Sequence, residues 1–160
     1  MGKNIQIGLL QLIFLFTMVK TLAQEEPKII EIIQAGGSTQ DQFNFPGANI
    51  LLKKAGTRVH LLHEGALIKS DISYFYPKQN FFKANGTVIF TQGDSLKMTC
   101  NQIEYNGNTK LAKAWGKVVL KRPDMNLRTD TLYLDRLKSE AFYNSFGTIL
   151  DEKRKLTSIR

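Results

Sequence analysis

The stretch Ala84-Asn85-Gly86-Thr87-Val88-Ile89-Phe90 recurs 30 residues later as Ala114-Trp115-Gly116-Lys117-Val118-Val119-Leu120. In both copies a small residue and a glycine precede a run of β-branched, aromatic and aliphatic residues, which is the composition of a short strand. The preceding sequence repeats at the same interval, since Ile68, Ser70, Asp71 and Phe75 correspond to Met98, Cys100, Asn101 and Tyr105. A third copy, shifted by one residue, contains Leu127, Thr129, Asp130, Leu132 and Leu134. Self-similarity at a fixed period indicates a repeat architecture.

Polar turns separate the strands of each unit. Their residue types, Gly, Asn, Asp and Pro, are those that tight turns favour. The turns are Gln92-Gly93-Asp94, Asn106-Gly107-Asn108 and Arg122-Pro123-Asp124. No segment after Val19 has a long helical period. We therefore predict an all-β fold of units of roughly 30 residues, stacked so that neighbouring units share one core.

The apolar pattern changes phase within each long strand. Met98 and Cys100 fall on one face of a regular strand, whereas Ile103 and Tyr105 fall on the other. A bend or bulge at the switch would keep both sets on one core, and the alternative is a sheet covered on both faces. The residues expected at these bends and at the turns into the strands are Asp71, Gly86, Asn101, Gly116, Asp130 and Gly147.

The N-terminus has the features of a secretory signal peptide. Lys3 precedes a mostly apolar run from residue 7 to residue 19, and Thr21-Leu22-Ala23 provides a cleavage site before Gln24. We expect a signal peptide over residues 1–23 and one domain over residues 24–160. The alternative is an uncleaved anchor. No cysteine lies near the cleavage site, which argues against a lipoprotein.

The chain is basic, with 22 Lys and Arg against 14 Asp and Glu and a formal net charge of +8. Cleavage would remove Lys3 and Lys20 and leave a charge of +6. A basic excess suits an anionic partner such as a phosphorylated lipid or a membrane surface, although it also fits a solvated surface. Export makes nucleic acid the least suitable partner.

The sequence contains no recognisable catalytic, cofactor or metal-binding motif. His60 and His63 lie three apart in a predicted strand and turn, so they would face opposite ways, and we expect surface or turn histidines. Cys100 is the only cysteine, which excludes an intramolecular disulfide and favours a buried, inert thiol. We therefore predict no catalytic residues, no metal and no cofactor.

Aromatic residues are plentiful and recur at related positions of the units. We expect most of them in the core, although an apolar sheet interior could also accept acyl chains. They are Tyr74, Phe75, Tyr76, Phe81, Phe82, Phe90, Tyr105, Trp115, Tyr133, Phe142, Tyr143 and Phe146.

Seven segments of the chain share a pattern with one known family. The segments are Phe45–Leu51, His63–Ile68, Ser70–Tyr76, Ala84–Val88, Gln92–Leu96, Tyr105–Thr109 and Leu127–Leu132. From about Lys28 to the C-terminus, they resemble the OstA-like (LptA-type) lipopolysaccharide transport family in its Bacteroidetes-type form. The chain departs from the family after Gly86 and Gly116, where an asparagine is common.

The resemblance implies an antiparallel β-jellyroll, open at both ends, that acts in the periplasm. It implies a non-enzymatic bridge that carries lipopolysaccharide toward the outer membrane, with lipid A acyl chains inside and phosphates at basic groups. It also implies edge-to-edge stacking with other OstA/LptA-like modules. The apolar positions expected to line the lipid are Ile68, Val88, Phe90, Met98, Tyr105, Val118, Leu120, Leu127, Leu132 and Leu134.

Two other functions stay open. One is a structural or assembly module that binds an outer-membrane protein through its sheet edges and carries no lipid. The other is a β-solenoid glycan enzyme, which would need a cluster of carboxylates that the sequence does not provide. We also expect a further unit after Leu156-Thr157-Ser158-Ile159-Arg160, so the domain looks truncated there, with a last unit that lacks its strand partner.

Overall fold

The computed structural model of the chain describes residues 28–151 and 156–159. The described residues form one antiparallel sheet of 13 strands and a single turn of 3-10 helix, η2 (Pro77–Gln79). The prediction of an all-β antiparallel jellyroll is therefore confirmed. The predicted signal peptide, residues 1–23, lies outside the described residues.

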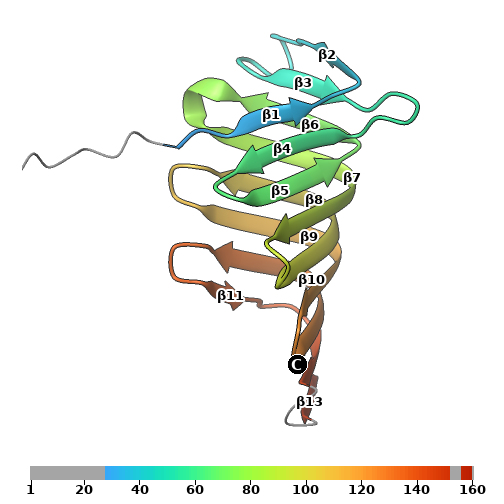
Figure 1. Cartoon of the computed structure of the whole chain (residues 1–160), viewed down its shortest axis with the longest axis vertical. Coiled ribbons are helices and arrows are strands. Elements are labelled where there is room, and N and C mark those ends of the chain that lie inside the picture. Colours follow the sequence, from blue (N-terminus) through green and yellow to red (C-terminus); the bar gives the residue numbers. More distant parts are fainter. Residues whose placement is uncertain (1–27, 152–155, 160) are drawn as a thin grey trace, which may run out of the picture.

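Four long strands connected by tight turns form the middle of the sheet (Figure 1). They are β7 (Phe81–Gln92), β8 (Leu96–Asn106), β9 (Leu111–Arg122) and β10 (Met125–Asp135). The three predicted polar turns join them in order. The short strands predicted after Gly86 and Gly116 are parts of β7 and β9, because the chain bends at each glycine without leaving the sheet.

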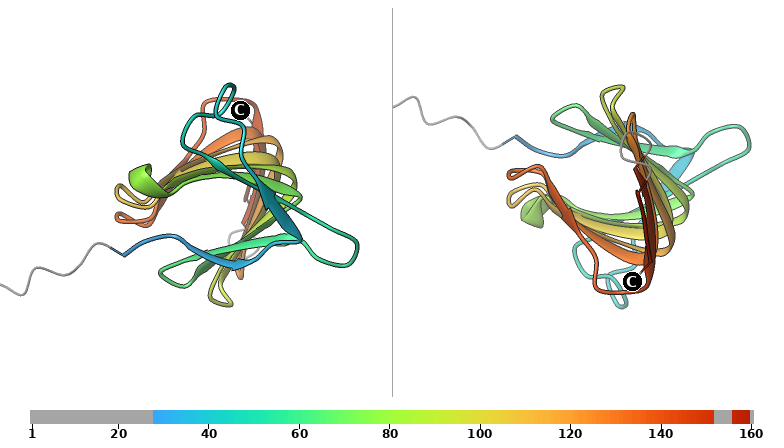
Figure 2. Two further views of the ribbon diagram at one scale, coloured as in Figure 1. Left: turned by 90° about the horizontal axis from the view of Figure 1, so that it is seen from above. Right: turned by 90° about the horizontal axis from the view of Figure 1, so that it is seen from below.

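Each long strand is bent near its middle, so its two halves belong to two different arms. Figure 2 shows the arms diverging from this bend and leaving the molecule open on one side. We call them the β5 arm and the β6 arm after the strands that pair with the two halves of β7. The β5 arm adds β1 (Glu31–Gln34), β4 (Val59–His63), β5 (Ala66–Ser70), β12 (Gly147–Asp151) and β13 (Leu156–Ile159). The β6 arm adds β2 (Gly37–Thr39), β3 (Asn49–Leu52), β6 (Ile72–Tyr76) and β11 (Glu140–Phe142).

The bends form a line across the sheet, which we call the fold line. The register between β7 and β8 shifts between Asn85 and Val88, and comparable shifts interrupt the next two strand pairs. Each shift turns the following residues over, so alternate side chains on both sides of the bend face the same interior. Met98, Cys100, Ile103 and Tyr105 are consequently all buried.

Glycine is required where a neighbouring strand crosses the fold line closely. Gly86 has φ +75° and a Cβ there would lie 2.9 Å from the Cβ of Asp71. Gly116 has the same φ, and its Cβ would lie 2.9 Å from the Cβ of Asn101. A position with left-handed φ, where a Cβ would also touch a neighbouring segment, accommodates only glycine.

Two expectations were wrong. Only four of the twelve aromatic residues, Phe75, Phe82, Phe90 and Tyr105, are buried, because strand alternation turns most of the others outward. His63 is 1% exposed and is no surface residue, since it shares the inner face of β4 with Val59 and Leu61. The truncation of the last unit stays a prediction, and β13, the last strand described, pairs with β12 alone.

Candidate functional site between the two arms

The inner faces of the two arms meet in one apolar cluster. All ten positions expected to line a lipid lie in it, and none is more than 5% exposed. Seven come from the β5 arm, namely Ile68, Val88, Phe90, Met98, Val118, Leu120 and Leu127. Three come from the β6 arm, namely Tyr105, Leu132 and Leu134. Over most of its length the interior is thus a packed core.

The six positions expected at bends and turns lie on or beside the fold line. Asp71 separates β5 from β6, and Gly86, Asn101, Gly116 and Asp130 lie within β7, β8, β9 and β10. Gly147 begins β12, where a Cβ would lie 2.7 Å from the Tyr143 ring. Lys53 and Arg58 hold the Asp71 carboxylate, with N···O distances of 3.1 and 3.4 Å.

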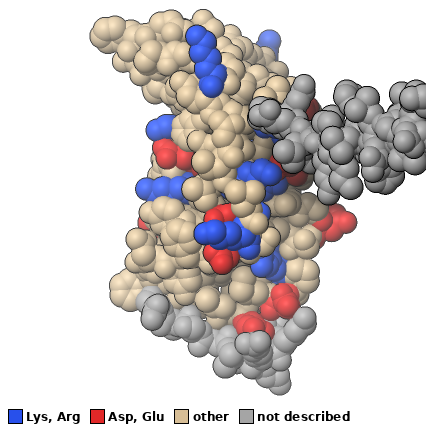
Figure 3. Space-filling model, turned by 90° about the vertical axis from the view of Figure 1, so that its left-hand side faces the viewer, with Lys and Arg blue, Asp and Glu red and all other residues tan. Residues whose placement is uncertain are grey.

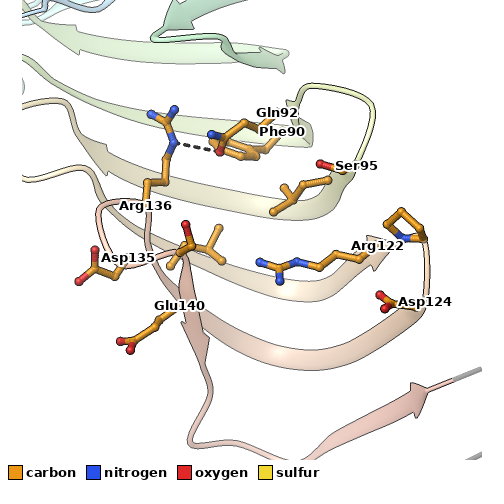
Figure 4. A pocket seen from close by; sticks show the side chains of 12 residues that line it. Phe90, Gln92, Ser95, Arg122, Asp124, Asp135, Arg136 and Glu140 are labelled. Atoms are coloured by element: carbon orange, nitrogen blue, oxygen red, sulfur yellow. Dashed lines mark hydrogen bonds between the residues drawn. The ribbon is translucent and has the colours of Figure 1, made fainter. Parts of the chain in front are cut away.

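A groove of about 310 Å³ opens between the tips of the two arms. Phe90, Leu96 and Leu134 supply its apolar part, so two of the expected lining residues border it. Figure 4 shows Arg122 extending into this space from the end of β9 and Arg136 reaching toward Gln92. The remaining residues at the groove are Ser95, Pro123, Asp124, Asp135, Ser139 and Glu140. An apolar floor with charged groups around it is the usual composition of a ligand site.

Arg136 joins the two arms beside the groove. From the turn after β10 its guanidinium donates to Gln92 Oε1 at 3.1 Å and to the Glu64 carbonyl at 3.1 Å, both on the β5 arm. It also donates to the Tyr105 hydroxyl. We call the group Arg136, Gln92, Glu64, His63, Tyr105 and Lys110 the clasp.

His63 and Tyr105 form the buried part of the clasp. The His63 Nε2 lies 3.0 Å from the Lys28 carbonyl, which can only accept, so this nitrogen carries the proton. Nδ1 then accepts from the Tyr105 hydroxyl at 2.7 Å, and the Tyr105 oxygen accepts from Arg136. Burial raises the pKa of Tyr105, and the nearby Arg136 charge opposes this shift.

Glu64 and Lys110 complete the clasp at the surface. Their carboxylate and ammonium groups lie 2.8 Å apart, and Lys28 approaches the same carboxylate at 3.6 Å. The hydrogen bond from Lys110 lowers the pKa of Glu64, and desolvation partly opposes it. Figure 3 looks onto this side of the molecule, where acidic and basic side chains lie intermixed.

The residues from 28 to 30 form a strap above the clasp. Asn80 of the β6 arm accepts from the Ile30 backbone N–H at 2.8 Å and donates to the Lys28 carbonyl at 3.0 Å. Ile30 is 2% exposed and packs into the core. The strap and the clasp therefore hold the tips of the two arms together. Each of their hydrogen bonds has a side chain as donor or acceptor. The groove lies beside them.

Sequence reasoning missed the clasp and the polar part of the groove. Arg136 meets Tyr105 in β8, Gln92 at the end of β7 and Glu64 in the turn after β4, which are 31, 44 and 72 positions away in the chain. Tyr105 belongs to the repeat, but neither the repeat nor the apolar alternation links Arg136 to any of these three residues. His63 offered one usable signal, since it continues the inward alternation of Val59 and Leu61.

The remaining chemistry of the described residues is sparse. No group of three or more His, Cys, Asp or Glu side chains among residues 28–151 and 156–159 is placed to hold a metal ion. Cys100 is buried as predicted, and burial raises the pKa of its thiol to about 12. No helix in the described part of the chain is long and apolar enough to cross a membrane.

Comparison with known proteins agrees with this architecture. The family model described as OstA-like protein matches residues 30–160. Among solved structures, the chain is similar to LptH of Pseudomonas aeruginosa, described as the LptA-homologous periplasmic component of the conserved lipopolysaccharide transport device. The TM-score is 0.61 at 10% identity, over 72% of this chain and 82% of LptH, so this likeness concerns the fold. No curated protein sequence matches the chain.

Proposed function

Because this chain belongs to the OstA-like family, we propose that it is a non-enzymatic periplasmic module of lipopolysaccharide transport that holds lipid acyl chains between its arms. The fold likeness to LptH, whose description assigns it to a lipopolysaccharide transport device, supports this direction. The proposal includes export through cleavage of residues 1–23, and it requires neither a cofactor nor a metal.

One observation carries the proposal, namely the continuity between the apolar interior and the groove. Phe90 and Leu134 belong both to the buried cluster and to the groove lining. An acyl chain that enters the groove would therefore meet further apolar side chains as it moves inward. Burial of a hydrocarbon chain is favourable by about 0.8 kcal/mol per CH₂ group.

The groove is small for this role, at the lower end of the volumes of about 300–1,000 Å³ usual for ligand sites. A larger lipid requires the arms to part. The clasp and strap are suited to this motion, because side-chain hydrogen bonds separate more readily than the backbone ladders within each arm. Arg122 and Arg136 stand at the groove, where they could pair with phosphate groups of lipid A.

The sheet edges suit the second part of the proposal, stacking with other modules of the same kind. Within the described residues, β1 and β2 pair on one side only at one end of the sheet. At the other end, β11 and β13 do the same. Unpaired strand edges can add a strand from a neighbouring molecule, so end-to-end pairing would extend the interior from one module to the next.

The alternative is an assembly module that uses these edges to bind an outer-membrane protein and holds no lipid. Site-specific photo-crosslinking in cells separates the two functions. A photoreactive residue at Leu134 faces the groove, whereas the same residue at the adjacent Tyr133 faces outward and is the matched control. We expect lipopolysaccharide adducts from position 134 and none from position 133.

A second inward position, Leu132, shows how far the lipid enters, because it lies in the core without bordering the groove. Protein adducts alone from positions 132 and 134 would favour the assembly module. Equal lipid labelling from 133 and 134 would contradict an interior site.

A further inference from the structure

The outer face of the β5 arm presents two rows of side chains in continuous cross-strand register. One row is His60, Lys69, Ile89, Thr99, Val119, Arg128 and Thr148. The other row is Leu62, Leu67, Thr91, Lys97, Lys121, Asn126 and Leu150. These 14 positions, which we call the basic face, alternate with the inward core positions of the same strands.

The basic face carries four Lys and Arg side chains and no acid. None of Lys69, Lys97, Lys121 and Arg128 takes part in an ion pair among the described residues. The first acid along these rows is Glu31, opposite Leu62 on the edge strand β1. Burial, with the positive charges of Lys69 and Arg58, lowers the pKa of His60, in keeping with a positive local field.

Two of these charges are placed against each other. Lys97 and Lys121 stand directly opposite on β8 and β9, and both are exposed. Like charges at directly opposed positions destabilise a sheet. No acid of the basic face neutralises the repulsion between these two lysines, although the repulsion opposes folding. The pair therefore points to an anionic partner outside the chain.

Apolar groups are interleaved with the charges. Arg128, Val119 and Thr148 border two shallow hollows on this arm, each of about 350 Å³. Phe146, 84% exposed, lies at one hollow, and Leu150, 43% exposed, lies at the other. Cations mixed with exposed apolar side chains match the layer where lipid head groups meet acyl chains.

We propose that the β5 arm docks through its basic face on the surface of a bilayer that contains anionic phospholipids. The cations extend over five neighbouring strands, or about 19 Å at the usual strand spacing of about 4.8 Å. Lipids diffuse in the bilayer and can gather at each cation, whereas an acidic protein would need fixed carboxylates at matching positions. Docking on this outer face leaves the groove free, so the inference does not depend on the proposed lipid transport.

Vesicle sedimentation with residues 24–160, which contain the whole described domain, tests the proposal. The vesicles are phosphatidylethanolamine and phosphatidylglycerol at a 3:1 ratio without lipopolysaccharide, and phosphatidylcholine alone is the neutral reference. We expect binding to the anionic vesicles that falls steeply with added salt and is absent on the neutral ones. Since the vesicles lack lipopolysaccharide, failure of the proposed transport function would not alter this result.

The decisive variant is K97Q/K121Q, which removes the opposed charges and should leave the fold intact or more stable. Each Lys near an anionic surface contributes about fivefold to binding, so the partition coefficient should fall about 20-fold or more. The matched control is K78Q/K138Q, which removes the same charge from tips of the β6 arm and should change binding less than about twofold.

Three results would overturn the proposal. They are absence of binding to the anionic vesicles, equal binding by K97Q/K121Q and the unmodified protein, and an equal loss in K78Q/K138Q. Binding to polyglutamate without binding to vesicles would identify an acidic polypeptide as the partner instead and also overturn it.

Discussion

The two arms present similar inner faces and very different outer faces. Inward, both contribute aliphatic and aromatic residues to a single core. Outward, the basic face of the β5 arm has four cations and no acid, whereas the β6 arm has a row of aromatic side chains mixed with two lysines and one glutamate. That row is Ile50, Tyr74, Lys83, Glu104, Lys113, Tyr133 and Phe142.

The contacts within the β6 row show that its charges are already satisfied. Lys83 and Glu104 form an ion pair at 2.8 Å. Lys113 lies over the rings of Trp115 and Tyr133, at 5.5 and 5.7 Å from the ring centroids. Because successive side chains of a strand point to opposite faces, one repeat can keep its inner residues while its outer residues change. The inner faces therefore serve the shared fold, and the outer faces distinguish the arms.

The strongest test of the shared interior compares one leucine from each arm. Leu120 in the β5 arm and Leu132 in the β6 arm are both fully buried. We expect Leu120→Ala and Leu132→Ala each to lower the free energy of unfolding by about 2–5 kcal/mol. Urea denaturation, monitored by tryptophan fluorescence, measures the free energy of unfolding of both variants. A loss confined to one variant would show that the arms do not share a cooperative core.

The fold line is the next test, because it is where the arms diverge. Gly116→Val places a β-branched side chain at φ +75° and against Asn101, and should cost about 1–3 kcal/mol. Gly37→Val is the matched control, since a Cβ there meets no atom within 4 Å. Equal melting temperatures for the unmodified protein and the Gly116 variant would exclude this role for the glycine.

The clasp links the arms with a smaller, pH-dependent contribution. The pKa of Glu64 is lowered in the folded state, so its stabilisation is present above its ordinary value of 4.5 and is lost as the pH falls through the folded pKa. Lys110→Gln should therefore lower stability at pH 7 by less than about 1 kcal/mol, and the difference should disappear as the pH falls through the folded pKa of Glu64. Denaturation of the variant and the unmodified protein at several pH values measures this stability difference. Lys138→Gln, which breaks an exposed pair within the β6 arm, should show little effect, and a pH-independent loss in the Lys110 variant would contradict the linkage.

The smallest expected effect is a gain of stability at the fold line. Thr87 has φ +40° and directly follows Gly86 at the fold line. Thr87→Asn should raise the free energy of unfolding by about 0.5 kcal/mol, because asparagine tolerates the left-handed region better than a β-branched residue. Thr99→Asn, at an ordinary strand position of β8, should not raise it. A loss of stability in the Thr87 variant would mean that other contacts set this conformation.

The strands, the polar turns and the inward residues can be predicted from the amino-acid sequence alone. The apolar alternation of Met98 and Cys100, its phase change before Ile103, and the recurrence of Gly86 as Gly116 are local properties of the chain. They predict a bent strand wherever they occur, because side chains alternate strictly along a strand and a bulge is needed to restore the phase.

The division of the half-strands into two arms, and the contacts between distant side chains, become visible in the folded structure alone. The hydrogen bond between His63 and Tyr105 and the reach of Arg136 to Gln92 depend on closure between segments far apart in the chain. No local pattern encodes such a contact, because it forms only after the intervening strands have added to the sheet in order. The opposition of Lys97 and Lys121 depends on the register between β8 and β9. The outward rows of the two arms also differ in their charged residues, because the repeat constrains the inner residues and leaves the outer ones free to vary.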